Sequence, residues 1–526
     1  MPSHNGRNEL EVESGPENDE STEALQNEPN ISNEQNRTKY SKYSYKAILA
    51  QGLMATVALM ITATNGMTAG YPALLLPQLQ SENSTLLTTE EEGSWIASIH
   101  SIMTPIGSLM SGPIMERIGR RSSLLISIIP RVLGWLCISL ANSHLTLLAG
   151  RSLTGIATGL SAAPALVLLA EIAEPRLRGL LVGAPSTSFS LGILLIYALS
   201  SVLPWKTVAV VAMIIPLLAL ILFFLLPESP LWLAKMNRKE EALKALTWLR
   251  GGSEEQARHE LEVMNEQQQH NQLIDEANSS SKNRSPLLSR PILRALMVVN
   301  VFNFFQVMAG TFTIISYAVN VLQQATGGTA TDTEIAVVTA LTRVLLTAVA
   351  CFMLLRIGRR PMTISSGLGS GAAALLLSAW LLWAPETTMF SWVPPTLVIT
   401  FVIFNSYGFF MIQGLMIGEM FPARARGPAS GVTCATINTT LFFSTKLYPK
   451  MTHAFKPSGL FLFFGLMTLA GTLFAHLFMP ETKGKTLAEV EEHFSGPSLF
   501  WGRNNSPERR QNITENMPVR NAQNTN

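Results

Sequence analysis

Charge is scarce in this chain, and cysteine is nearly absent. Charged residues make up 14% of the 526 residues and hydrophobic residues 47%, a balance with too little charge for a soluble globular protein. The three cysteines, Cys137, Cys351 and Cys434, all fall in apolar segments, so neither a disulfide framework nor a metal site is indicated. Basic residues gather at the ends of apolar segments instead of forming a patch, which gives no sign of a nucleic-acid partner. These features favour a polytopic membrane protein.

The signatures of catalysis and of energy coupling are also missing. No nucleophile with a neighbouring base, phosphate-binding loop or nucleotide motif occurs, so we expect neither an enzyme nor an ATP-driven pump, and no cofactor. Residues 1–44 hold no apolar stretch, so we expect a disordered tail without a signal peptide. No Asp, Glu, Lys, Arg or His lies between Ala47 and Leu79. Proton coupling needs a titratable group in the path, so passive movement is favoured.

Twelve apolar segments of roughly 20 residues are long enough to cross a bilayer. They lie near residues 47–67, 94–114, 123–141, 146–170, 180–203 and 206–226, and near 293–320, 334–355, 361–384, 394–418, 428–448 and 458–479. We therefore expect an all-α polytopic membrane protein with two six-helix bundles, at 45–226 and 292–479. A loop with short helices and a linker is expected at 227–291, and a second polar tail at 480–526.

One half of the chain repeats the other. The segment Gly112 to Arg121, GPIMERIGRR, reappears as Arg356 to Pro361, RIGRRP. Two further pairs of motifs, EIAEPRLRG with EMFPARARG and PES with PET, recur at a similar interval of about 240 to 250 residues. Because the charged loops return to the same face each time, the pattern predicts a parallel duplication.

Lys and Arg in short loops mark the cytoplasmic side of a membrane. The loops at 72–92, 142–150, 321–333 and 385–393 contain neither residue, whereas the alternate loops are basic. We therefore predict a protein of the plasma membrane with both termini cytoplasmic, although Lys446, Lys450 and Lys456 run against the rule. Asn83 begins the one Asn-x-Ser/Thr sequence in a predicted external loop, which makes it the glycosylation candidate.

Acids recur beside bases at the predicted cytoplasmic ends of the spans in both halves. If these groups bridge the halves, they latch a cytoplasmic gate that must break when one half rocks against the other. The alternative is charge that only sets topology. The candidate gate residues are Glu116, Arg117, Arg120, Arg121, Glu171, Arg178, Glu228, Arg356, Arg359, Arg360, Glu419, Arg426 and Glu481.

The seventh span carries a polar stripe at intervals of three and four residues, which places it on one face of a helix. The stripe consists of Asn303, Gln306, Gly310, Thr313, Tyr317 and Asn320. Polar side chains in a span usually face the bundle interior or a water-filled cavity. The stripe indicates either the wall of a path for a polar solute or hydrogen bonds that hold helices together.

Two arginines lie deep in apolar segments, where a cation needs a partner or water. We expect Arg343 to face a central cavity, the alternative being a structural pairing. For Arg131 the structural pairing is favoured.

Together these motifs resemble the sugar porters of the major facilitator superfamily. The residues that carry the resemblance are Glu116–Arg121, Gly150–Arg151 with Gly155 and Gly159, Glu171 with Arg178–Gly179, Pro227–Pro230, Gln306 with Gly310 and Tyr317, Glu419 with Arg426–Gly427, and Pro480–Gly484. Within that family, Gly66 with Tyr71–Ala73, Leu133–Trp135 and Thr445–Lys446 look most like the insect facilitated trehalose transporter group.

The resemblance implies a twelve-helix alternating-access transporter with a central sugar site. Gln306 matches the first glutamine of the family's seventh-helix pair, but Val307 and Phe312 replace a glutamine and an asparagine. Ser190 stands at the fifth-helix glutamine, Gly414 at the tenth-helix tryptophan and Arg343 at an eighth-helix asparagine; Asn438 corresponds to an eleventh-helix asparagine. The expected substrate contacts are Gln306, Thr313, Tyr317, Ser190, Phe312, Arg343 and Asn438.

The sequence thus predicts a facilitative carrier of a small sugar, trehalose or a hexose, with the lipid bilayer as its surroundings and no obligate protein partner. A carrier of an organic anion on the same scaffold is the alternative, because Arg343 can pair with an anion and the usual sugar contacts are altered. A nutrient receptor that does not transport is a third interpretation, which the short polar tail after Phe494 disfavours.

Overall fold

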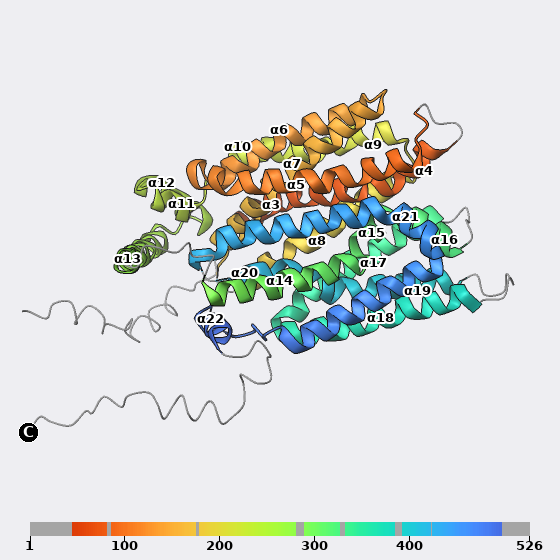
Figure 1. Cartoon of the computed structure of the whole chain (residues 1–526). Coiled ribbons are helices and arrows are strands. Elements are labelled where there is room, and N and C mark those ends of the chain that lie inside the picture. Colours follow the sequence, from red (N-terminus) through yellow and green to blue (C-terminus); the bar gives the residue numbers. More distant parts are fainter. Residues whose placement is uncertain are drawn as a thin grey trace, which may run out of the picture.

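The computed structural model describes residues 45–81, 86–174, 178–279, 289–326, 332–383, 392–421, 423–485 and 487–496. Over these residues the chain is helical and contains no strand. The helices run side by side as long rods in two groups, with smaller helices at one end (Figure 1).

The first bundle precedes residue 226. It consists of α3 (Tyr45–Gly70) with α4 (Pro72–Gln80), α5 (Glu90–Ile118), α6 (Arg120–Ser139), α7 (His144–Ile172), α8 (Arg178–Ser200), and α9 (Trp205–Ala212) with α10 (Ile214–Leu225).

The second bundle begins after residue 289. It consists of α14 (Arg290–Met308), α15 (Thr311–Ser316) and α16 (Ala318–Thr326), then α17 (Asp332–Arg356), α18 (Arg359–Trp383), α19 (Val393–Asn405), the π-helix η3 (Ser406–Phe410), α20 (Met411–Glu419) and α21 (Ala423–Phe478).

Ten helices of the described chain are long and apolar enough to cross a membrane by length and composition. Helix α21 is one of them, but its 56 residues contain a break at Lys456 (φ 57°, ψ 167°) and so supply two spans. Helix α5 is long enough but falls outside this group, because it is rich in Ser and contains His100 and Glu116. Counting these two, twelve spans form two bundles of six, which confirms the predicted fold class.

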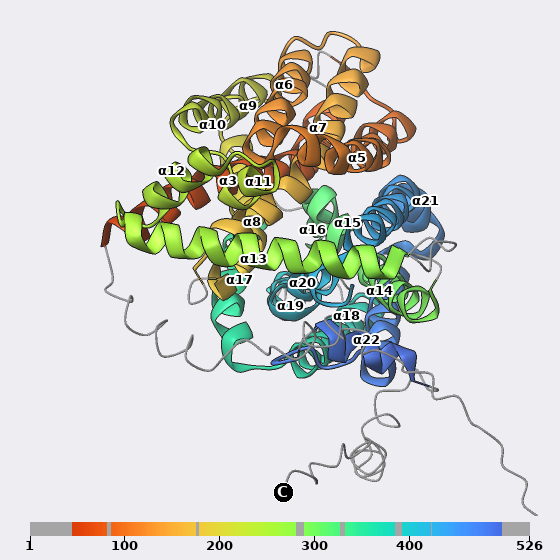
Figure 2. The same ribbon diagram turned by 90° about the vertical axis from the view of Figure 1, so that its left-hand side faces the viewer.

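Both glycines of the repeated loop, Gly119 and Gly358, lie at the same end of the bundles, which we call the charged end. Helices α11 (Pro230–Lys235), α12 (Lys239–Leu249) and α13 (Glu254–Ser279) cover it, together with α22 (Leu487–Ser495). Figure 2, which views the molecule from this end, shows α13 crossing in front of both groups of helices. The loop was expected to hold only short helices, but α13 has 26 residues because polar, helix-favouring residues continue the pattern to Ser279.

The seventh span departs from the prediction of one continuous helical face. Gly310 adopts the left-handed conformation (φ 85°), and a second interruption falls at Tyr317, so α14, α15 and α16 follow one another as separate pieces. A Cβ on Gly310 would lie 2.7 Å from the ring of Phe464, so both the backbone and the packing require glycine here.

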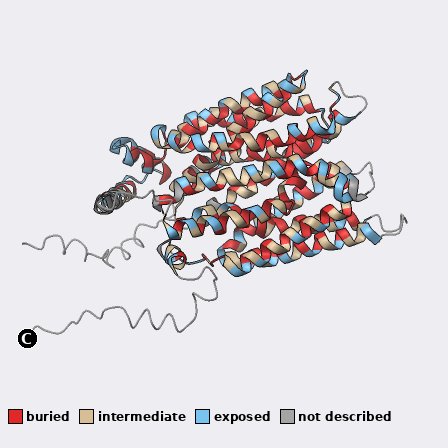
Figure 3. Cartoon of the chain, in the orientation of Figure 1, coloured by how far each residue is buried: buried red, intermediate tan, exposed pale blue. Residues whose placement is uncertain are grey.

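The buried apolar clusters differ in whether they join the two bundles. One buried apolar cluster contains residues of both bundles, such as Tyr71 and Tyr317. Two further clusters, around Phe223 and around Phe302, each belong to one bundle. Figure 3 shows buried and exposed positions alternating along each long helix, as expected for helices with one side packed in the protein and another facing lipid.

Candidate functional site

Three amide side chains of the second bundle are buried without hydrogen-bond partners. Asn303 and Gln306 lie on α14 and Asn405 ends α19; each is at most 1% exposed. In the described part of the chain, neither the amide nitrogen nor the amide oxygen of any of the three has a partner. A buried polar group left in this state costs roughly 1–3 kcal/mol, so each of the three amides would gain from a hydrogen bond to a polar ligand.

A π-helix follows Asn405 and shapes this part of the site. The wider turn of η3 frees backbone groups, and the Ser366 hydroxyl occupies them: it donates to the Phe404 carbonyl oxygen (2.6 Å) and accepts from the Phe409 N–H (2.9 Å). Gly408 allows this approach, since a Cβ there would lie 2.3 Å from that of Ser366. Such π-segments occur frequently at functional sites.

Phe410, the last residue of η3, joins the two bundles. Its ring centroid lies 5.9 Å from the ring of Phe189 on α8 and 5.9 Å from that of Phe312 on α15. The Arg343 guanidinium carbon lies 5.5 Å from the same ring, within the range of a cation–π interaction. Arg343 is 3% exposed, and one of its terminal nitrogens has no hydrogen-bond partner among the described residues. The group thus offers a buried, partly unsatisfied cation beside three aromatic rings.

On the side of the helix that carries Phe410, the next positions toward the charged end are glycines. Gly414 and Gly418 follow at intervals of four residues on α20, so they lie on the same side of the helix. Both are exposed, and a Cβ at either would meet no atom within 4 Å among those described. Because Phe410 points at Phe189 of the first bundle, this open side lies between the bundles.

The structure brings only some of the predicted substrate contacts together. Phe312 and Arg343 both meet Phe410, and Gln306 belongs to the unpartnered amides. Thr313 instead bonds Ser444 (2.7 Å between hydroxyl oxygens), and Tyr317 donates to the Thr445 carbonyl (3.1 Å). These two residues fasten α15 and its junction with α16 to α21.

The remaining predicted contacts bond within their own helices. Ser190 donates to the Ser186 carbonyl (2.9 Å) and Asn438 to the Cys434 carbonyl (2.9 Å). Sequence reasoning missed Phe189, Asn405 and Phe410. The polar pair Asn405–Ser406 inside an apolar span was a usable signal, whereas nothing in the sequence distinguishes these phenylalanines from lipid-facing ones.

Two arginines are buried in the first bundle against neutral oxygens. Arg131 donates to Asn65 Oδ1 (2.6 Å), Ser161 Oγ (3.0 Å) and the Ala157 carbonyl (3.1 Å), and it also contacts the Thr64 hydroxyl. Arg151 donates to the carbonyls of Thr68 (2.6 Å) and Ile96 (3.1 Å). Within the described chain neither pairs with a carboxylate, so both act as clamps between helices.

At the charged end each bundle holds the same four-residue arrangement. In the first bundle Arg120 pairs with Glu171 (3.0 Å), Ser229 donates to Glu171, and Glu228 accepts the backbone N–H groups of Arg120 and Arg121 (both 2.9 Å). We call this set and its counterpart the charged quartets.

In the second quartet Arg359 pairs with Glu419 (2.8 Å), and Thr482 donates to Glu419 (2.5 Å). Glu481 accepts the backbone N–H groups of Arg359 (2.9 Å) and Arg360 (3.1 Å). Glu228 and Glu481 therefore cap the first turns of α6 and α18, although each carboxylate is distant in sequence from the helix that it caps.

Other candidate gate residues bond nearby groups of the same half of the chain. Glu116 pairs with Lys235 (2.5 Å), and the Arg121 guanidinium donates to the Phe223 carbonyl (2.7 Å). Arg360 donates to the His476 carbonyl and the Arg356 carbonyl accepts from Lys483, both at 2.5 Å. The Arg117 side chain is exposed and has no ion pair among the described residues. The side chains of Arg178 and Arg426, and all of Asn83, lie outside what the structure describes.

The shorter polar contacts between the bundles lie at the opposite end, whereas two longer ones to cysteine sulfur, Ser108–Cys434 (3.2 Å) and Thr187–Cys351 (3.5 Å), lie nearer the charged end. Lys446 on α21 donates to Ser94 of α5 (2.8 Å) and lies 4.0 Å from the Trp95 ring centroid. His453 contacts Glu90 (2.7 Å), and the Tyr197 hydroxyl donates to the Ile315 carbonyl (2.6 Å). Together with the shared apolar cluster, these contacts close the opposite end, while the described ion pairs of the charged quartets stay within their bundles.

Comparison with known proteins adds three findings. Residues 51–494 match the family model described as "Sugar (and other) transporter". The facilitated trehalose transporter Tret1 of Polypedilum vanderplanki is 30% identical over 86% of this chain and 89% of its own length. Tret1 of Anopheles gambiae is 29% identical over 82% of this chain, which spans only 54% of that longer relative.

Among solved structures, the proton:xylose symporter XylE bound to 6-bromo-6-deoxy-D-glucose matches with a TM-score of 0.68. The match covers 85% of this chain and 100% of that one, at 20% identity. At this identity the likeness speaks for the fold alone.

Proposed function

The chain belongs to the sugar transporter family of the major facilitator superfamily, and from that premise we propose that it moves trehalose or a hexose by facilitated diffusion. The observation that carries the proposal is the set of unpartnered amides of Asn303, Gln306 and Asn405. Amide groups that both donate and accept, placed near aromatic rings, are suited to hydroxyl-rich solutes. The names of the Tret1 relatives support a sugar as the substrate.

The open side of α20 favours a disaccharide over a hexose. Where the family has a tryptophan, this chain has Gly414, with open space beside it. An indole at this position would fill room that a second sugar ring can occupy. We therefore expect Gly414→Trp to reduce trehalose uptake by tenfold or more while hexose uptake changes little. Equal loss of both sugars would contradict the size argument.

Uncoupled movement is supported by the neutral surroundings of the buried arginines. Arg131 and Arg151 bond amide, hydroxyl and carbonyl oxygens, none of which changes protonation in the physiological range. A proton-coupled path requires a group that does. The described chain offers no carboxylate to either arginine.

The mechanism that we propose is alternating access, with the charged end in the cytoplasm. The basic loops favour that orientation and cytoplasmic termini. Contacts such as Lys446–Ser94 join the bundles at the outer end in this conformation, while the surroundings of Gly414 and Gly418 toward the inner end are open. In the outward-open conformation, the candidate gate residues of the two bundles would approach each other and latch the inner end.

Uptake of labelled trehalose and glucose into proteoliposomes tests the proposal. We expect saturable uptake, exchange of external for internal sugar, and no response to an imposed pH gradient. Uptake driven by an inward proton gradient would refute uncoupled transport but leave the sugar site intact. Failure of every sugar to enter or exchange would refute the substrate class.

A carrier of an organic anion is the second candidate, favoured by the buried Arg343 with its unpartnered nitrogen. A carboxylate or phosphate bound there would gain a charge-assisted hydrogen bond. Arg343→Gln is then expected to abolish anion uptake and spare neutral sugar. Equal loss of both would reject this candidate.

A further inference from the structure

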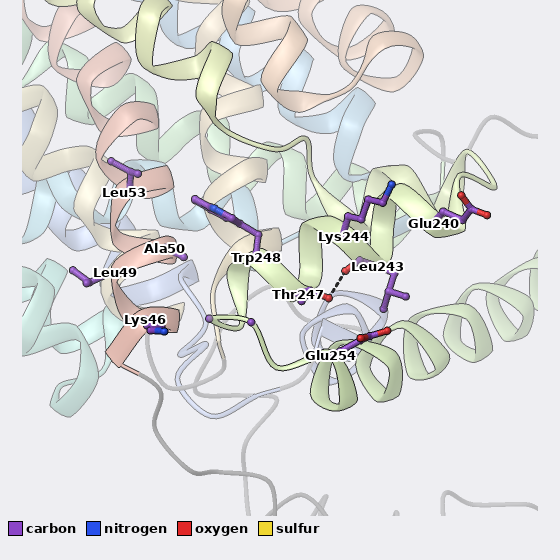
Figure 4. Close-up of a pocket in the computed structure, with 12 residues that line it drawn as sticks. Lys46, Leu49, Ala50, Leu53, Glu240, Leu243, Lys244, Thr247, Trp248 and Glu254 are labelled. Atoms are coloured by element: carbon purple, nitrogen blue, oxygen red, sulfur yellow. Dashed lines mark hydrogen bonds between the residues drawn. The ribbon is translucent and has the colours of Figure 1, made fainter.

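A hollow lies outside the bundles' interior, where the first span meets the helices of the charged end. Its volume is about 940 Å³, and it lies between the first turns of α3 on one side and α12 with the start of α13 on the other (Figure 4). The lining residues are Lys46, Leu49, Ala50, Leu53, Glu240, Leu243, Lys244, Thr247, Trp248, Gly251, Gly252 and Glu254. None of them belongs to the candidate sugar site.

Cations outnumber available anions around this hollow. Lys46 and Lys244 are exposed, and no hydrogen bond or ion pair is found for either ammonium in the described part of the chain. Of the two lining acids, Glu254 already pairs with Arg258 (2.6 Å), which leaves Glu240. Among its described residues, the hollow therefore presents two unpaired lysines and one unpaired carboxylate, a net charge of one positive unit.

A neighbouring groove of about 590 Å³ continues the positively charged surface along the charged end. It shares Lys244 and Trp248 with the first hollow and adds Arg121. The Arg121 guanidinium donates to the Phe223 and Phe224 carbonyls, with no carboxylate partner in the described chain. Two acids line this groove: Glu241 pairs with Arg238 (2.6 Å), and Glu228 accepts backbone N–H groups at the start of α6. With Arg121, Arg238 and Lys244 against these two acids, the groove keeps one net positive charge, so both hollows favour an anion.

Apolar surface adjoins the cations on the membrane side. Leu49 and Leu53 on α3 are 53% and 46% exposed, and Phe224 and Leu225 at the end of α10 are 67% and 74% exposed. Figure 4 shows Leu49 and Leu53 following Lys46 along α3, with the Trp248 ring extending toward them from α12. An amphipathic indole beside lysines and leucines is typical of the level at which lipid headgroups meet acyl chains.

We propose that this hollow binds an anionic phospholipid of the leaflet at the charged end. Its phosphate lies between Lys46 and Lys244, and one acyl chain runs over Leu49 and Leu53. The bound lipid links the first span to α12, so it ties the first bundle to the helices that cover the charged end. The proposal does not depend on which solute the protein carries.

Binding of dioleoylphosphatidylglycerol to the purified full-length protein tests the proposal, with dioleoylphosphatidylcholine and inorganic phosphate as comparison probes. Native mass spectrometry counts the retained lipids, and the thermal shift in detergent reports their effect on the folded protein. We expect phosphatidylglycerol to be retained and to raise the melting temperature. The other two probes should do neither.

The decisive variant is Lys46→Gln with Lys244→Gln. Two lysines at an anionic surface correspond to roughly a 30-fold change in affinity, so the double variant should lose retained phosphatidylglycerol to that extent. Lys239→Gln is the matched control, because Lys239 is exposed on the same helix but lines neither hollow. An unchanged melting temperature without lipid verifies that the variants fold.

Three results would overturn the proposal. Retention of phosphatidylglycerol by the double variant at the level of the unmodified protein would exclude the two lysines. Equal retention of phosphatidylcholine would exclude recognition of charge. Equal stabilisation by inorganic phosphate would replace the lipid with a soluble anion. Since the test measures binding and not transport, none of these outcomes bears on the sugar proposal.

Discussion

Glu228→Gln is the substitution that best separates a local role of the charged quartets from a role between the bundles. The Glu228 carboxylate accepts the backbone N–H groups of Arg120 (2.9 Å), Arg121 (2.9 Å) and Ser122 (3.2 Å) at the start of α6. Gln keeps the size of the side chain, but it removes the charge and turns one acceptor oxygen toward these donors as an NH₂ group.

The expected loss follows from those contacts. One N–H group, that of Ser122, loses its acceptor and faces another donor, which costs roughly 1–3 kcal/mol. The favourable interaction of a negative charge with the helix N-terminus, typically about 0.3–1 kcal/mol, disappears as well. We therefore expect Glu228→Gln to lower the free energy of unfolding by about 2–3 kcal/mol.

Denaturant unfolding of the purified protein in micelles, followed by tryptophan fluorescence, measures this loss. Glu481→Gln in the second bundle should behave similarly, because Glu481 caps α18 through two N–H groups. Glu241→Gln is the matched control: it removes one partner of an exposed ion pair with Arg238, which contributes at most about 1 kcal/mol.

The refuting result is specific. If Glu228→Gln leaves stability unchanged but shifts labelling of introduced cysteines toward the conformation open at the charged end, Glu228 acts between the bundles and not as a cap. Destabilisation with an unchanged labelling pattern supports the local role.

Three further predictions concern packing, pH and the site. Gly192→Ala should destabilise or misfold the protein, because its Cβ would lie 1.8 Å from the Ala63 carbonyl, whereas Gly52→Ala, with open space around it, should fold normally in the same thermal assay. Burial, assisted by Lys485, lowers the pKa of His493 to about 4 from its ordinary 6.5. Between pH 6.5 and 4, His493 binds a proton when α22 is released but not when α22 is docked, so docking of α22 should weaken as the pH falls through this range. Amide hydrogen exchange of α22 measures this effect. His493→Gln should remove the pH dependence. Asn405→Ala should weaken apparent sugar affinity by about 5- to 150-fold in uptake assays, and an unchanged affinity would contradict the amide site.

The sequence predicted the architecture because membrane spans have an unambiguous signal. Apolar length locates helices such as α6 and α17 to within a few residues, and the repeated charged motifs identify the duplication. Where the prediction was wrong, backbone geometry was the cause. A periodic stripe in the seventh span indicated one helix, but Gly310 in the left-handed conformation redirects the chain and separates Gln306 from Thr313.

The candidate site was only partly predictable because its members are brought together by breaks in regular structure. Asn405 and Phe410 owe their positions to the π-turn and to Ser366, which lies on α18, far away in sequence. Glu228 and Glu481 were predicted to be gate acids from their charge. Their backbone partners, which make them caps, are visible only in three dimensions.

Each bundle contains a charged quartet, but the buried polar residues in the interiors of the two bundles differ. In the first bundle, the buried Arg131 and Arg151 donate hydrogen bonds to oxygens of α3, α5 and α7, and so they hold these helices together. The second bundle leaves Asn303, Gln306 and Asn405 without partners and breaks its seventh and tenth spans beside them. A solute that satisfies those amides would therefore change the energy of the second bundle far more than that of the first. Phe410 contacts both Phe312 of the broken seventh span and Phe189 of the first bundle, so under the proposed alternating access it would link binding in the second bundle to the boundary between the bundles.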